Sequence, residues 1–140
     1  MNANETARLG AYLSKQFGSP TMSVSHRSGD YADVLVGGDK VAELIKDVDE
    51  GETSYSVSLE LPVKAGAKKG APIDDGERVR VQQVLRDKLH SVGLEVRPRP
   101  RKTDSCEVYV GEEFIGTLST DPDAGYFLTM SILDIDLDGE

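Results

Sequence analysis

The C-terminal segment carries the residues whose spacing comes closest to a metal site. It reads D-I-D-L-D-G-E over 134–140, which places carboxylates at Asp134, Asp136 and Asp138. Carboxylates at alternate positions open the calcium-binding loop of EF-hands, where they fold around the ion. The chain ends before the closing bidentate glutamate of such a loop, and its apolar residues alternate as in a strand. We therefore predict no metal site and no cofactor, but a strand whose carboxylates point outward.

A run of basic residues interleaved with prolines is the second candidate. It places Arg97, Arg99, Arg101 and Lys102 around two prolines. A proline-containing segment of this kind is extended and presents its cations at alternating positions. One interpretation is a surface that binds an acidic partner or a phosphate-bearing ligand. The other is an edge strand that leads into a solvated connector, with its charge offset by neighbouring acidic residues.

The remaining reactive residue types form no recognisable catalytic set. Cys106 is expected to face the core, and neither His26 nor His90 has a Cys or His partner at metal-ligand spacing. The serines occupy alternating strand positions rather than a G-x-S-x-G turn. The glycines at 37–38 and at 111 are not followed by a helix, so they suit hairpins better than phosphate binding. Carboxylates are numerous, but the sequence assigns none of them an acid or base role. We predict no catalytic residues.

An internal repeat organises the whole chain. The stretch C-E-V-Y-V-G-E-E-F-I-G-T-L at 106–118 has an earlier copy, A-D-V-L-V-G-G-D-K-V-A-E-L, at 32–44. A helical pattern precedes each copy and a strand pattern follows it. Offsets of 72, 74 and 71 residues align identical residues of the two halves, such as Glu5 with Glu77, Leu13 with Leu85, Val36 with Val110, Gly37 with Gly111 and Tyr55 with Tyr126. The sequence therefore predicts one unit written twice.

Each unit is predicted to be a helix followed by antiparallel strands. Apolar residues at 3.6-residue spacing, with capping residues at the ends, indicate helices at 4–17 and 76–90. Alternation is clearest at 54–61, which predicts a sheet with one buried and one wet face. The expected strands are 21–26, 32–36, 41–45 and 54–61, then 94–97, 107–110, 114–118 and a last strand from 126 to 133 or 137.

These elements predict an α+β fold of tandem duplicated helix-plus-antiparallel-meander units that form a pseudo-dimer. The first αβββ(β) repeat covers 1–61, a linker rich in glycine, alanine, proline and lysine covers 62–76, and the second repeat covers 77–140. A unit of this size is marginally stable alone. We expect the two units to cover each other, with their sheets joined edge to edge or packed so that the helices meet. Tyr109 and Phe127 fall on the nominally wet face of the second unit, and the alternation slips after Ile132, which a bulge or a tail crossing onto the other unit would explain.

Composition narrows the class of protein. The formal net charge is −9, which disfavours nucleic acid and anionic membrane as partners and fits plain solubility or a basic partner. No apolar run approaches the roughly 20 residues that span a bilayer. The N-terminus lacks the layout of a signal peptide, and a single cysteine excludes an internal disulfide. These features favour the cytoplasm.

The second half resembles a known family. Its helix V-Q-Q-V-L-R-D-K-L, the run V-R-P-R-P-R-K-T-D-S-C-E-V-Y-V-G-E-E-F-I-G-T-L and the ending M-S-I-L-D-I-D-L-D are similar to short alphaproteobacterial proteins classed as domain of unknown function 3126. The resemblance covers 77–138. The first half looks like a diverged copy that lacks the R-P-R-P-R-K run. The resemblance implies an α+β cytoplasmic protein of alphaproteobacteria, and it implies no function.

The leading hypothesis is a non-catalytic protein–protein interaction module, a small acidic adaptor or regulator, acting as a monomer or homodimer. It would bind another protein through a sheet edge or a surface patch. The candidate interaction residues are Arg97, Arg99, Arg101, Lys102, Tyr109 and Phe127. One alternative is a secretion-type chaperone that holds a client protein. The other is a small-molecule-binding protein or enzyme with its site between the repeats.

Overall fold

A computed structural model describes residues 1–61, 73–121 and 125–137, and it contains one eight-stranded antiparallel sheet. The first half consists of α1 (Ala3–Phe17), β1 (Met22–Ser28), β2 (Tyr31–Val36), β3 (Asp39–Asp49) and β4 (Glu52–Leu61). The second half consists of α2 (Asp75–Leu89), β5 (Leu94–Arg99), β6 (Lys102–Val110), β7 (Glu113–Asp121) and β8 (Gly125–Leu133), followed by the short helix α3 (Asp134–Leu137). Both halves thus repeat the order of one helix and four strands, which confirms the predicted duplicated α+β fold.

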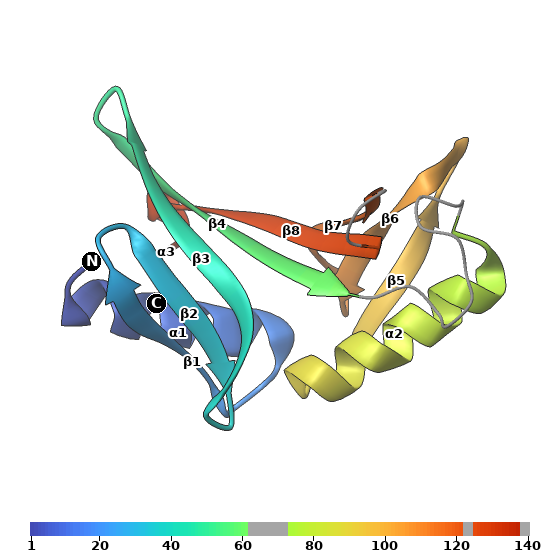
Figure 1. Ribbon diagram of the computed structural model, residues 1–140, viewed down its shortest axis with the longest axis horizontal. Helices are drawn as coiled ribbons and strands as arrows, with labels where there is room; N and C mark the ends of the chain where they lie inside the picture. The colour runs from blue at the N-terminus through green and yellow to red at the C-terminus, as the bar shows by residue number, and fades with distance from the viewer. Residues whose placement is uncertain (62–72, 122–124, 138–140) are drawn as a thin grey trace.

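The two copies join edge to edge through their last strands. The strand order is β1-β2-β3-β4-β8-β7-β6-β5, so β4 and β8 meet at the centre and β1 and β5 form the outer edges (Figure 1). The β4–β8 pairing runs from Ser54 opposite Leu133 to Leu61 opposite Tyr126. Of the two arrangements expected from the sequence, the edge-to-edge sheet is therefore the one that the chain adopts.

Both long helices lie against the same face of the sheet, each next to the first strand of its own copy. Their apolar faces bury Leu9, Leu13 and Phe17 from α1 and Val81, Leu85 and Leu89 from α2. The C-terminal ends of the helices also meet, because the Ser91 hydroxyl donates a hydrogen bond to the carbonyl oxygen of Phe17. The covered face of the sheet is thus a single apolar core shared by both copies.

Each helix is anchored at its N-terminus by the same pair of residues. The Tyr55 hydroxyl on β4 donates to Glu5 at 2.9 Å, and the Tyr126 hydroxyl on β8 donates to Glu77 at 2.5 Å. Both tyrosine side chains cross the buried layer and bring their hydroxyls to a partner, as buried phenols require. The residues that the repeat aligned are therefore the two partners of one hydrogen bond, present in each copy. These carboxylates fix the helices to the sheet.

The last described residues differ from the sequence expectation. Residues 134–137 form a helical turn and not a strand, so the predicted outward-facing strand is wrong there. The Asp136 carboxylate accepts a hydrogen bond from the backbone N–H of Leu133, and this bond closes the turn. Leu137 is buried and α3 contacts α1 and β4, so the tail does cross onto the first copy. Asp138, Gly139 and Glu140 lie outside the described residues, as does the 62–72 part of the expected linker.

Candidate functional site

The side of the sheet that faces away from α1 and α2, here called the open face, has neither of the two long helices against it. One row of paired residues crosses all eight strands on this side. It is formed by Ser25, Asp33, Glu43, Ser58, Thr129, Thr117, Glu107 and Arg97. Uncharged hydroxyls therefore occupy its centre, flanked by Asp33 and Glu43 in the first copy and by Glu107 and Arg97 in the second.

A neighbouring row on the open face carries exposed apolar side chains. It consists of the paired residues Tyr31, Ile45, Ser56 and Ser131 and, beyond the end of the β7–β8 pairing, of the pair Phe114 and Tyr109, and we call it the aromatic row. Tyr31 is 46% exposed, Ile45 39% and Phe114 52%. Large exposed side chains gathered along one face are unusual for a surface that contacts only water. The aromatic row thus has an apolar cluster in each copy with two serines between them.

The structure brings together two of the candidate residues from the sequence, Arg97 and Tyr109. The Arg97 guanidinium lies 4.1 Å from the centre of the Tyr109 ring, and that ring makes an edge contact with Phe114, with 5.6 Å between the ring centres. Arg97 also bonds Glu95 at 3.2 Å and donates to the carbonyl oxygen of Gly111 at 3.1 Å. Its charge is therefore already engaged, and its role here is to hold the aromatic cluster of the second copy in place.

The other four candidates lie elsewhere. Arg99 donates to the Ser105 hydroxyl, in a row that continues through Ser119 to Phe127 on the opposite side of the central row from Tyr109. Arg101 and Lys102 lie at the turn between β5 and β6, where both are exposed and Arg101 has a φ of 64°. The six residues therefore do not form a single patch.

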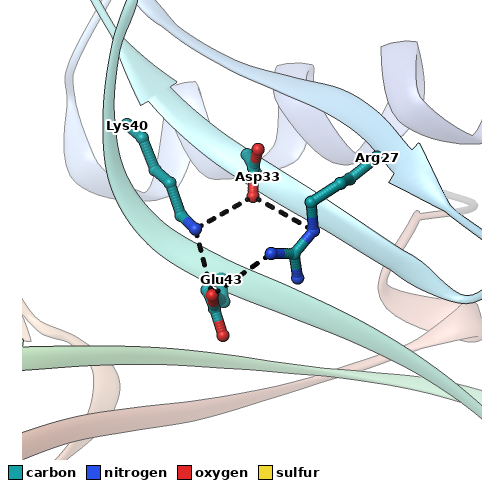
Figure 2. A network of polar contacts seen from close by, with 4 residues as sticks. All are labelled: Arg27, Asp33, Lys40 and Glu43. Carbon is teal, nitrogen blue, oxygen red and sulfur yellow. Dashed lines mark hydrogen bonds and ion pairs between the residues drawn. The ribbon is translucent and has the colours of Figure 1, made fainter.

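A charged quartet on the first copy was missed by the sequence reasoning. Arg27 on β1, Asp33 on β2 and Lys40 and Glu43 on β3 form a ring of ion pairs, with the shortest, at 3.0 Å, between Lys40 and Glu43 (Figure 2). Each partner shifts the other, since Glu43 raises the pKa of Lys40 and Lys40 lowers the pKa of Glu43. The two cations offset the repulsion between Asp33 and Glu43, because the sheet register sets these carboxylates directly opposite each other. This register is the feature from which the quartet could have been predicted, but it depends on strand pairing that the sequence alone does not give.

Each copy also has a notch where two neighbouring strands splay apart. The β3–β4 pairing starts only at Glu43 opposite Ser58, and the β7–β8 pairing reaches no further than Thr117 opposite Thr129. The first notch, of about 290 Å³, is lined by Lys40, Val41, Ala42, Glu43, Ser58, Leu59 and Glu60. The second notch, of about 380 Å³, is lined by Tyr12, Gln16, Phe114, Ile115, Gly116, Thr117, Thr129, Met130, Ser131 and Asp136. The repeat offsets map one notch onto the other.

The cavity that lies between the two copies is different in character. Its lining is wholly apolar, from Leu13 and Phe17 of the first copy to Leu89 and Met130 of the second. Its volume of about 10 Å³ is at the lower limit for one water molecule. Among the residues described, none that lines this cavity is titratable, so it offers no group for acid–base chemistry.

The isolated reactive residues occupy structural positions. Cys106 is 3% exposed, and burial raises the pKa of its thiol. His90 is the left-handed C-cap of α2, and His26 is an exposed residue whose ring lies 3.1 Å from the Gly29 carbonyl oxygen. Within residues 1–61, 73–121 and 125–137, no three His, Cys, Asp or Glu side chains gather as metal ligands, and no helix is long and apolar enough to cross a membrane.

Comparison with known proteins gives a family but no activity. A family model described as "Protein of unknown function (DUF3126)" matches the chain twice, over residues 5–63 and over residues 77–136. The two matches coincide with the two structural copies, so the first half is a second, diverged instance of the same unit. No curated protein and no solved structure matched the chain in these comparisons.

Proposed function

We propose that this chain, which belongs to the DUF3126 family of proteins of unknown function, is a non-catalytic interaction module that binds another protein on the open face of its sheet. The aromatic row is the observation that carries the proposal. It presents Tyr31 and Ile45 at one end and Phe114 and Tyr109 at the other, all from strands whose opposite side packs into the core. Aromatic side chains fixed on a scaffold are typical anchors of protein interfaces.

The open face is favoured over the sheet edges because helix residues cover both edges. On β5, Arg78 donates to the Val96 carbonyl oxygen, and the Gln82 side chain accepts from the Val96 N–H. Arg86 donates to the Leu94 carbonyl oxygen in the same way, which leaves fewer main-chain groups for an added strand. On β1, Gly10 of α1 approaches so closely that a methyl group there would lie 3.3 Å from the Val24 nitrogen.

An enzymatic role between the copies has less support. The cavity there is small and apolar, and the polar pairs that involve core residues include the two tyrosine–glutamate pairs. The same pair recurs at each helix N-terminus, where it anchors a helix to a strand, so its duplication follows from the fold. The observations therefore favour binding over catalysis. The net charge of −9 further favours a protein partner over nucleic acid or an anionic membrane.

Site-specific photocrosslinking tests the proposed face. A photoreactive phenylalanine analogue is placed at Ser56 or Ser131, in the centre of the aromatic row, and at the exposed Ala11 of α1 as the matched control. We expect Ser56 and Ser131 to crosslink the same partner in cells and Ala11 to crosslink none. The isolated partner should then bind the purified wild-type protein and lose affinity for a Ser56→Arg variant. Crosslinking from Ala11 with the yield seen at Ser131, or unchanged binding by Ser56→Arg, would contradict the proposal.

A cytoplasmic location belongs to the same proposal. It is supported by the single cysteine, Cys106, which is buried as a free thiol in a chain without a disulfide among its described residues. Fractionation of an alphaproteobacterial cell that carries the gene should recover the protein with cytoplasmic markers. Recovery with periplasmic or membrane markers would overturn this part.

A further inference from the structure

The two notches share a backbone geometry but differ in their side chains. In the first notch, Lys40 and Glu43 bond each other and belong to the charged quartet (Figure 2). The repeat offset of 74 residues puts Phe114 and Thr117 at the same two positions of the second copy. The second notch therefore has an aromatic ring and a hydroxyl where the first has an ion pair. Its interior is not filled by the charged side chains of its own strands.

The lining of the second notch includes polar side chains and one negative charge. Gln16 of α1 and Asp136 of α3 reach it from the covered side of the sheet. Asp136 is the one formally charged residue among the described side chains that line it, and its Oδ2 is held by the Leu133 N–H at 2.9 Å. That hydrogen bond orients the carboxylate through one of its two oxygens. The described lining of the notch therefore carries one negative charge and no positive charge, which favours a cationic hydrogen-bond donor.

One wall of the notch is an unpaired stretch of strand. A Cβ atom on Gly116 would lie 2.3 Å from the Thr129 carbonyl oxygen, so that oxygen points toward β7. Main-chain groups two residues apart on a strand point to the same side, so those of Ser131 face β7 as well. Ser131 pairs with Ser56 of β4 on its other side, and the β7–β8 pairing has ended before it. Its carbonyl oxygen is therefore an acceptor directed into the notch.

From this arrangement we propose that the second notch binds an arginine side chain of the partner protein. The inference rests on the proposed function and names the chemistry of the partner at one position. A guanidinium is planar and carries five donors in a fixed fork, which suits the Asp136 carboxylate and the Ser131 carbonyl oxygen together. The ring of Phe114 and the side chain of Met130 give the aliphatic stem an apolar wall. A volume of about 380 Å³ is ample for one such side chain.

Other occupants fit less well. A carboxylate or phosphate would meet Asp136 without a cation on the described lining. A metal ion would find one carboxylate, where hard cations take six or more oxygen ligands. A lysine ammonium brings a point charge and no planar face for the Phe114 ring, so it should bind more weakly than a guanidinium. The net charge of −9 adds long-range attraction for a basic partner, but this attraction does not select one site on the surface.

The test uses N-acetyl-arginine methylamide as the probe and the neutral citrulline analogue as its matched control. Both are titrated into the isotope-labelled full chain, and amide shifts are followed by NMR at physiological salt. We expect saturable shifts from the arginine probe alone, centred on Gln16, Thr117 and Ser131. Asp136→Asn should weaken binding at least tenfold, because the amide keeps an acceptor for Leu133 but loses the charge. Asp39→Asn, at the β2–β3 turn of the first copy, should leave binding within twofold of wild type.

A second variant introduces the side chain of the first copy. Phe114→Lys sets a cation at the position of Lys40 and should abolish the arginine response while the remaining spectrum stays folded. Equal shifts from the citrulline probe, or unchanged binding by Asp136→Asn and Phe114→Lys, would overturn the proposal. That failure is separable from failure of the proposed function. Photocrosslinking from Ser56 and Ser131 would persist if only the arginine site were wrong, and it would be lost if the open face were not the interface.

Discussion

Replacing Gly116 with alanine should damage the fold at the point where β7 passes closest to β8. A Cβ atom built on Gly116 would lie 2.3 Å from the Thr129 carbonyl oxygen, 3.1 Å from the Met130 Cβ and 3.2 Å from the Thr129 carbonyl carbon. Two of these three contacts are with main-chain atoms, which cannot rotate away as a side chain does. The strands must therefore move apart, or the Thr117–Thr129 pairing must break.

The size of the effect follows from two opposing terms. Overpacking inside a folded core costs about 1–3 kcal/mol, and a clash with main chain belongs at the upper end of that range. Alanine lowers the conformational entropy of the unfolded chain relative to glycine, which stabilises the folded state by about 0.4–1 kcal/mol. The net loss is about 2 kcal/mol. For a chain of 140 residues, an unfolding entropy of about 2.1 cal/mol/K per residue converts this into a fall in Tm of about 7 °C.

Urea and thermal unfolding followed by circular dichroism measure this loss, and Gly93→Ala is the matched control. A Cβ atom on Gly93 would meet only the Val110 side chain, at an ordinary 3.8 Å, so that variant should equal the wild type or exceed it slightly. Ala42 occupies the equivalent position in the first copy, so a methyl group is tolerated there. A Gly116→Ala protein within about 0.5 kcal/mol of wild type would refute the close approach of β7 and β8.

Three further predictions concern buried and half-buried groups. Lys46, Tyr55 and Asn2 lower the pKa of Glu5 to about 2. The stability advantage of wild type over Glu5→Gln should therefore be full above about pH 4.5 and vanish as the pH falls toward 2. Urea unfolding across this pH range measures the advantage, and an advantage independent of pH would contradict the prediction. Tyr55→Phe and Tyr126→Phe should each lower the free energy of unfolding by about 1–2 kcal/mol in the same assay, because both remove the hydroxyl that anchors a helix. A loss for one variant alone would show that the two anchors are not equivalent. The Cys106 thiol should react with a disulfide reagent at least a hundredfold more slowly in the native protein than in urea, and equal rates would show that it is not buried.

Much of the fold could be predicted from the sequence because its signals are local. The alternation at 54–61 puts Tyr55, Val57, Leu59 and Leu61 on one side, and all four are at most 7% exposed. The two helices begin at capping residues that the sequence identifies, and the aligned glutamates and tyrosines proved to be hydrogen-bond partners. Identity between copies thus identified a contact as well as an alignment.

The C-terminal turn could not be predicted because its pattern is ambiguous. Leu133, Ile135 and Leu137 alternate as in a strand, yet only Leu137 is buried, while Leu133 is 53% and Ile135 72% exposed. The Asp136 hydrogen bond to the Leu133 N–H decides the conformation, and a short run of alternating residues does not reveal it. A prediction of secondary structure from such a run rests on too few residues.

The candidate site was predicted only in part, for a different physical reason. Tyr109 and Phe127 were correctly placed on the wet face by alternation, but the rows in which they lie depend on register across strands. The charged quartet and the notches arise from the bulges near Leu35 and Tyr109 and from the splay of neighbouring strands. These are long-range features, and no local pattern in the sequence encodes them.

The pairing of β4 with β8 is the feature on which the open face and both proposals depend, because it makes one continuous surface out of two copies. Nuclear Overhauser effects in the isotope-labelled protein test it directly. We predict short Hα–Hα contacts at alternate pairs of the series that runs from Ser54 opposite Leu133 to Leu61 opposite Tyr126. Contacts of β4 with a different strand, or a β8 edge without any partner on this side, would contradict the account.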